Sequence, residues 1–126
     1  MLSGCTLDTV VFFVSRLARS VAFYRDTLGL AVAPVEDGHE GPYATARAGA
    51  VTLVFIERAA RAGESPVCVF TLPGGIDDCA EALAAKGVEI VVPVSEAPDG
   101  GLTLDFLDPD GNLLSLYQPA DAPRRR

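Results

Sequence analysis

The chain has 126 residues, of which 49% are hydrophobic and 21% are charged, and its formal net charge is −7. This size and composition predict a single soluble globular domain with a substantial core. The negative charge argues against nucleic acid as a partner, because a phosphate backbone binds a basic face. No apolar run reaches the roughly 18–20 residues that a membrane span needs, so no membrane partner is expected either.

The cysteines and the N-terminus indicate a compartment. Cys5, Cys68 and Cys79 lack the spacing of metal ligands, and their odd number fits a reducing cytoplasm better than an oxidising compartment. The N-terminus has neither the charged nor the apolar segment of a secretory signal. We therefore predict a cytoplasmic protein.

The first half of the chain is predicted to form a βαβββ module over about residues 6–58. A strand rich in Val and Phe is expected over residues 6–14. Apolar residues then recur at helical spacing from Leu17 to Leu28, and Gly29 is suited to end the helix. Further strands are expected over residues 30–36, 43–48 and 51–57, and residues 58–65 form a predicted linker.

The second half repeats this order over about residues 66–118. A strand over residues 66–72 precedes a helix with an apolar stripe from Ile76 to Leu83, which Gly87 ends. Strands are expected over residues 88–94 and 102–107. The turn-forming residues 108–111 (DPDG) then predict a hairpin with the last strand. Residues 119–126, which end in three arginines, are predicted to be a flexible tail.

These elements predict an α+β fold in which two βαβββ modules form a curled mixed-sheet cup with the helices outside. Each helix covers one face of its four strands, and the other face must also be covered. An inner surface of this kind is where small molecules bind. The repeated order of elements in the two halves of the chain supports this two-module architecture.

Two segments resemble the vicinal oxygen chelate superfamily, which includes glyoxalases, extradiol dioxygenases, and bleomycin and fosfomycin resistance proteins. One is residues 14–30 (VSRLARSVAFYRDTLGL), similar to the family's first strand-to-helix segment, and the other is residues 107–116 (LDPDGNLLSL), similar to its closing hairpin. The resemblance covers residues 6–118, which we take as one domain. It implies the fold and a homodimer, but not the reaction, because one fold carries many chemistries.

Metal-dependent members of the superfamily hold a divalent ion with four residues, typically His or Glu. The resemblance places these four positions at Thr9, Thr52, Val67 and Ser115. Hydroxyl groups and a valine provide neither imidazole nor carboxylate, which divalent transition metals require. We therefore predict no metal and no other cofactor.

Strand alternation predicts which side chains face the inside of the cup. They are mostly apolar, with scattered hydroxyl groups and one carboxylate, which suits a mid-sized ligand that is largely apolar or aromatic. The predicted ligand-binding residues are Thr9, Val11, Phe13, Thr52, Val54, Val67, Val69, Asp105, Ser115 and Tyr117, with Ile56, Thr71, Thr103 and Leu107 on the same faces.

Two of these residues are candidate catalytic groups. Asp105 is either a carboxylate inside the cup, usable as a general base, or a solvated side chain near its rim. Tyr117 either donates a hydrogen bond to the ligand or packs on Pro119 at the rim.

Three residues outside this set have open roles. His39, the one histidine, is either a surface loop residue or part of a lid over the cup. Arg47 either meets an anionic group of the ligand or is an exposed arginine on an edge strand. Tyr43 could form a stacking wall for a planar ligand.

Three functions are compatible with these residues. The favoured one is a metal-free protein of the glyoxalase and bleomycin resistance type that binds a small molecule. The second is a lyase, isomerase or dioxygenase-like enzyme of the same superfamily. It would use displaced metal ligands such as Glu57, Asp105 or His39, or metal-free acid–base catalysis through Asp105 and Tyr117. The third is a structural or interaction role with a vestigial pocket.

Overall fold

The computed structural model describes residues 3, 9–38, 41–59, 61, 63 and 65–126. The chain divides into two compact units, Met1–Ala60 and Arg61–Arg126. This boundary falls within the segment that was predicted to link the two modules. The units are described separately below. No helix in the described part of the chain is long and apolar enough to cross a membrane.

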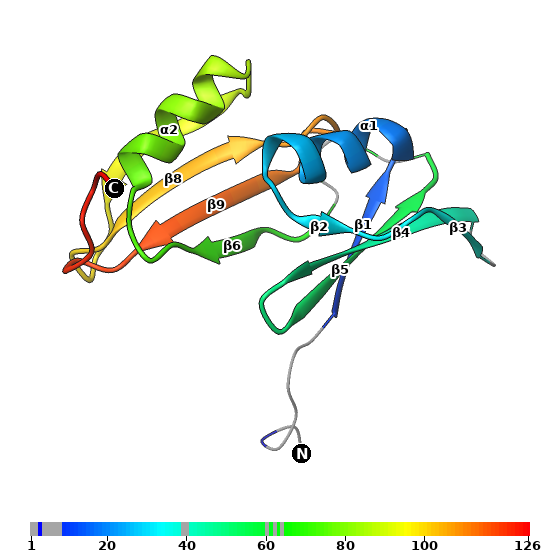
Figure 1. The fold of residues 1–126 in the computed structure, drawn as a ribbon, viewed down its shortest axis with the longest axis horizontal. Helices are drawn as coiled ribbons and strands as arrows, with labels where there is room; N and C mark the ends of the chain where they lie inside the picture. Colours follow the sequence, from blue (N-terminus) through cyan, green and yellow to red (C-terminus); the bar gives the residue numbers. More distant parts are fainter. Residues whose placement is uncertain (1–2, 4–8, 39–40, 60, 62, 64) are drawn as a thin grey trace. The chain divides into compact units, whose positions relative to one another are not determined.

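The first unit is a mixed sheet with a helix on one face (Figure 1). Its elements are β1 (Thr9–Val14), α1 (Leu17–Ala22) continuing as a π-helix, η1 (Phe23–Thr27), and then β2 (Ala31–Val32), β3 (Glu36–Gly38), β4 (Gly41–Ala48) and β5 (Val51–Glu57). The strand order is β1-β5-β4-β2, and β3 also pairs with β4. The pair β1–β5 is parallel and the others are antiparallel.

The strand predicted over residues 30–36 is two short strands in the structure. Both β2 and β3 pair with β4, and residues 33–35 separate them. Pro34 lies in this gap, where its missing N–H group cannot contribute to the ladder. One proline thus divides a segment that otherwise reads as a strand.

The core of the first unit lies between the sheet and α1. Phe12 and Phe55 from the sheet and Tyr24 from η1 are fully buried, and the ring centroids of Tyr24 and Phe55 are 4.4 Å apart. The helix begins without a side-chain cap of its own. Instead, the Leu17 N–H group donates to Oε2 of Glu57, 2.8 Å away, so the end of β5 satisfies the start of α1.

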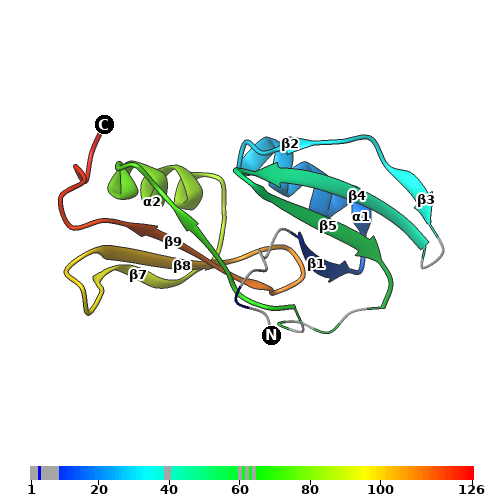
Figure 2. The ribbon, with the colours of Figure 1, turned by 90° about the horizontal axis from the view of Figure 1, so that it is seen from below.

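The second unit has the predicted order of one strand, one helix and three strands. Its elements are β6 (Cys68–Thr71), α2 (Ile76–Ala85), β7 (Ile90–Glu96), β8 (Leu102–Leu107) and β9 (Leu113–Gln118). The strand order is β6-β9-β8-β7, in which only β6–β9 is parallel among the described strands (Figure 2). The predicted α+β fold, with two such modules each carrying a helix on one face of a mixed sheet, is confirmed.

The predicted hairpin between β8 and β9 is held by one aspartate. Oδ1 of Asp108 accepts hydrogen bonds from the N–H groups of Asp110 and Asn112, each at 2.9 Å, and Oδ2 accepts from the Asn112 side chain. Gly111 has a φ of 77°, which a residue with a side chain rarely adopts. The turn residues therefore act as the sequence suggested.

Residues 119–126, predicted to be a flexible tail, turn back onto the start of α2 in the structure (Figure 1). We call them the C-terminal strap. The Gly75 N–H group donates to the Pro123 carbonyl at 2.7 Å, and the Asp77 N–H group donates to the Arg124 carbonyl at 3.0 Å. Because α2 has no side-chain N-cap, the strap occupies backbone donors that would otherwise lack a partner.

Gln118 joins the strap to the helix. Its Oε1 accepts from the Ile76 N–H group at 2.9 Å, its Nε2 donates to the Ala122 carbonyl at 3.1 Å, and the residue is fully buried. Two arginines add ion pairs. Arg124 binds Asp77, and Arg125 binds Asp78 and Glu81. The acidic first turn of the helix thus attracts the basic end of the chain.

The strap ion pairs predict a loss of stabilisation in acid. Hydrogen bonds from Arg124 and Arg125 lower the pKa of Asp77 and Glu81 respectively. A carboxyl group whose pKa is lowered by folding stabilises the fold above its ordinary pKa, and this contribution disappears as the pH falls through the lowered pKa. We expect Arg124→Gln/Arg125→Gln to lower the melting temperature slightly at pH 7, because the pairs are largely exposed.

The test compares this variant with the unmodified protein by thermal unfolding at pH 7 and at about pH 3. The difference in melting temperature should be smaller in acid, and it should also shrink in high salt at pH 7. A difference that is the same under all three conditions would show that the arginines act by packing and not by charge.

Candidate functional site

The predicted ligand-binding residues of the first unit lie on the face of the sheet that no helix covers. Thr9 pairs with Thr52, Val11 with Val54 and Phe13 with Ile56. Their neighbours along the strands, Phe12, Val14, Leu53 and Phe55, are buried on the opposite face, toward α1. We call the outer side the helix-free face of the first sheet.

The second sheet repeats this division. One row of its helix-free face runs from Val69 through Ser115 and Asp105 to Val92, and the next row contains Thr71, Tyr117 and Thr103. The buried side chains Leu104, Phe106, Leu114 and Leu116 alternate with these residues and face α2. Val67 lies directly before β6 and is 53% exposed, and Val69 is 60% exposed. Both helix-free faces therefore carry accessible apolar side chains.

The strand register shows which residues lie opposite one another at the positions where the superfamily resemblance implies metal ligands. Thr9 and Thr52 are direct neighbours across β1 and β5. In the second unit, however, the residue opposite Ser115 is Val69 and not Val67. Because both are valines, the donor chemistry is unchanged, and these positions do not fit a divalent transition metal. Among the residues that the structure describes, no three His, Cys, Asp or Glu side chains cluster as a metal site would require.

Two of the proposed displaced ligands are placed by the structure. Glu57 pairs with the buried Val14 and its carboxylate accepts from the Leu17 N–H group, so it lies on the side of α1 and not on the helix-free face. Asp105 is half-buried, with Ser115 and Val92 as its neighbours across the sheet. His39, the third, lies outside the described residues.

Tyr117 has a partner within the protein that the sequence analysis missed. Its Oη donates to Oδ2 of Asp99 at 2.5 Å, and Oδ1 of Asp99 accepts from the Gly101 N–H group at 2.9 Å. The bond to Asp99 raises the pKa of Tyr117, and the same bond lowers the pKa of Asp99. Tyr117 is therefore a weaker proton donor at neutral pH than a free tyrosine.

Three aromatic and basic side chains lie at the borders of the helix-free face of the first sheet. Tyr43 lies beside β3, and Phe13 and Arg58 lie near the end of β5. Oη of Tyr43 donates to Glu36 at 2.6 Å, which raises the pKa of Tyr43. The guanidinium carbon of Arg58 lies 3.9 Å from the centre of the Phe13 ring, a cation–π contact. Sequence spacing gave no signal for this contact, because Arg58 lies in the predicted linker.

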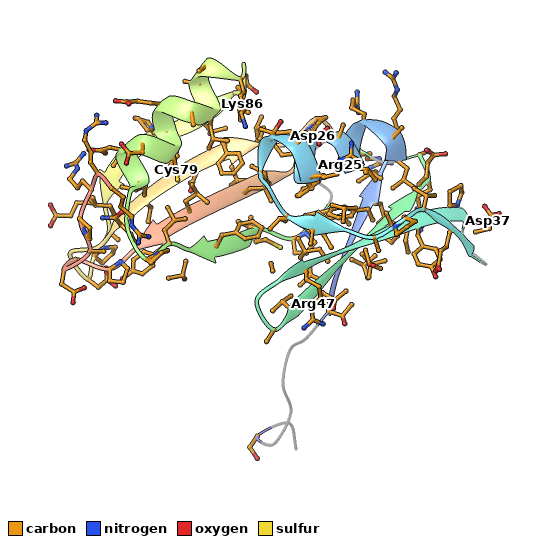
Figure 3. The ribbon with its side chains drawn as sticks, in the orientation of Figure 1. Arg25, Asp26, Asp37, Arg47, Cys79 and Lys86 are labelled. Carbon is orange, nitrogen blue, oxygen red and sulfur yellow. The ribbon has the colours of Figure 1, made fainter. Side chains whose placement is uncertain are left out.

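Arg47 is not on an edge strand, as one of the two sequence interpretations had it. Strand β4 lies between β5 and β2, and Arg47 pairs with Thr52 on one side and Ala31 on the other. Figure 3 shows its side chain on the side of the sheet away from α1. Its Nη1 donates to Oγ1 of Thr52 at 3.3 Å, so it belongs to the same polar row as Thr9 and Thr52.

Comparison with solved structures supports the fold. The chain is similar to a superfamily member from Sphaerobacter thermophilus (19% identity, covering 90% of this chain and 97% of that one, TM-score 0.76). It is also similar to the fosfomycin resistance protein FosX from Listeria monocytogenes (20%, covering 94% of each chain, TM-score 0.72). A virulence protein from Salmonella typhimurium is a further neighbour (22%, covering 90% and 96%, TM-score 0.69).

Comparison by sequence identifies the family. No curated protein sequence matches the chain. The sequence profile of the Glyoxalase/Bleomycin resistance protein/Dioxygenase superfamily, however, matches residues 6–116. This match covers both units and both segments that carried the resemblance. The chain therefore belongs to the glyoxalase, bleomycin resistance protein and dioxygenase superfamily.

Proposed function

We propose that this protein binds a mid-sized, mostly apolar or aromatic molecule on the helix-free face of a sheet, without a metal. The proposal is supported chiefly by the side-chain chemistry at the positions where the superfamily resemblance implies metal ligands. Thr9 and Thr52 carry hydroxyl groups, as does the largely buried Ser115, whereas Val67 before β6 and Val69 opposite Ser115 carry no polar group. Exposed valines supply apolar surface on each face: Val11 on the first sheet, and Val67 and Val69 on the second.

The enzymatic alternative uses Asp105 and Tyr117 for proton transfer, and the described contacts favour it less. Tyr117 would have to leave Asp99 before it could donate to a ligand. Its raised pKa also moves it away from the range useful for acid–base catalysis near neutral pH. Homodimer formation stays a prediction that comes from the superfamily resemblance.

The test measures binding of metal and of an apolar probe separately. Titration calorimetry of the metal-stripped protein with Ni²⁺, Zn²⁺ and Mn²⁺ should give no stoichiometric binding. A fluorescence titration with N-phenyl-1-naphthylamine, a neutral aromatic probe, should give saturable binding. Val11→Asp should weaken probe binding roughly tenfold, because it places a charge in the apolar contact surface.

The matched control for this variant is Ala84→Asp, which makes the same change in charge on the exposed surface of α2. It should bind the probe like the unmodified protein. Stoichiometric metal binding that is lost on substituting residues of the helix-free faces would refute the metal-free part of the proposal. Equal probe binding by the two aspartate variants would refute the location of the binding surface on the helix-free face.

A further inference from the structure

Arg47 is held on the helix-free face of the first sheet by neutral oxygen atoms. Nη1 donates to Thr52 Oγ1 at 3.3 Å and Nη2 donates to the Gly49 carbonyl at 3.5 Å. Strands on both sides fix the backbone of Arg47, so the guanidinium projects from an interior strand and not from a loop. Its direction is therefore set by the sheet, while its two hydrogen bonds are long.

Some of the other arginines that the structure describes are paired with carboxylates. Arg25 binds Asp26, Arg124 binds Asp77, and Arg125 binds Asp78 and Glu81. Within the described residues, Arg47 forms no such ion pair. A guanidinium group has five N–H donors, and the two bonds of Arg47 use only two of them. The remaining donors are available to a ligand.

Thr52 adds a second donor at the same place. Its hydroxyl oxygen accepts from Arg47, which leaves its own O–H group able to donate. Thr52 and Arg47 are cross-strand neighbours, so the hydroxyl and the guanidinium project from the same face of the sheet. One full positive charge with two kinds of donor is the arrangement that recognises an oxyanion.

We propose that Arg47 and Thr52 bind an anionic oxygen group of the ligand, such as a carboxylate, so that the ligand is an apolar or aromatic acid. This inference rests on the proposed function and narrows it to one ligand class. The apolar part of the ligand packs on neighbouring side chains of the same face, of which Val54 lies two residues from Thr52 along β5. The anionic group forms its hydrogen bonds at the guanidinium fork.

The experiment compares two probes that share one ring skeleton. 8-Anilinonaphthalene-1-sulfonate carries a sulfonate group, and N-phenyl-1-naphthylamine lacks it. In fluorescence titrations, we expect the unmodified protein to bind the sulfonate probe roughly tenfold more tightly. Arg47→Gln should remove this preference and leave binding of the neutral probe unchanged. Arg47→Lys should retain part of the preference, because it keeps the charge and loses the fork.

The matched control is Arg25→Gln, which removes an arginine that is already paired with Asp26 on η1. It should keep the preference for the sulfonate probe. Circular dichroism establishes that each variant is folded, and Arg47→Lys provides the comparison if Arg47→Gln is not. Equal affinity of the unmodified protein for both probes would overturn this inference and leave the proposed function intact. An equal loss of affinity for both probes in Arg47→Gln would do the same. Binding of neither probe would overturn the proposed function, and the inference with it.

Discussion

Replacing Phe55 with alanine is expected to destabilise the first unit by about 3–5 kcal/mol, the range found for deleting a buried aromatic ring. Phe55 is fully buried against the rings of Tyr24 and Phe12, whose centroids lie 4.4 Å and 5.6 Å from its own. The deletion removes apolar surface and leaves a cavity that the rigid strands β1 and β4 on either side cannot fill.

Urea denaturation followed by tyrosine fluorescence and circular dichroism measures this loss of unfolding free energy. The matched control is Val54→Ala, one residue away on β5 and on the opposite, helix-free face. Because Val54 is only half-buried, its truncation should cost about 1 kcal/mol or less. Similar losses for the two variants would contradict the assignment of faces on which the candidate site depends.

Replacing Gln118 with leucine is expected to destabilise the second unit by about 2–4 kcal/mol, because two backbone groups lose their partners. The Ile76 N–H group at the start of α2 and the Ala122 carbonyl in the C-terminal strap both bind this one side chain. Leucine has a similar volume but no polar atom. The loss therefore reports on the hydrogen bonds and not on packing.

Thermal and urea unfolding give the magnitude, and Gln118→Glu serves as the comparison. Glutamate keeps an acceptor for the Ile76 N–H group, and a negative charge is favourable at the N-terminus of a helix. Because Gln118 is fully buried, however, the carboxyl group must either bury a charge beside the Ala122 carbonyl or take up a proton, so this variant should be less stable at pH 7 than in mild acid, a pH dependence that the leucine variant lacks. A leucine variant as stable as the unmodified protein would show that the hydrogen bonds of Gln118 do not stabilise the start of α2.

Local patterns in the sequence were enough for much of the fold. Alternation along β1, β5, β8 and β9 assigns each side chain to the correct face, because the strand period of two is strict. The hairpin at Asp108 follows from turn chemistry that acts over four residues. The end of the first helix at Gly29 also follows from a local signal, since its φ of 76° suits glycine.

The sequence could not show contacts between distant residues. The strap depends on hydrogen bonds between residues more than 40 positions apart, and a run of arginines after prolines resembles a free tail. The pairing of Tyr117 with Asp99 spans 18 positions and depends on the geometry of the loop between β7 and β8. The register of the parallel pair β6–β9, in which Val69 lies opposite Ser115, is set by tertiary packing and has no local signal in the sequence.

The parallel pairs also determine how each unit can fold. In the first unit, Thr9 pairs with Thr52, a separation of 43 residues, and in the second, Val69 pairs with Ser115, a separation of 46. The hairpins β4–β5 and β8–β9 need only short turns. The entropy of closing a long loop therefore falls on the parallel pairs, so we expect them to form late in the assembly of each unit. Until that step, the apolar residues of β1 and β6 have no partner strand, so this is when the chain is most open to aggregation.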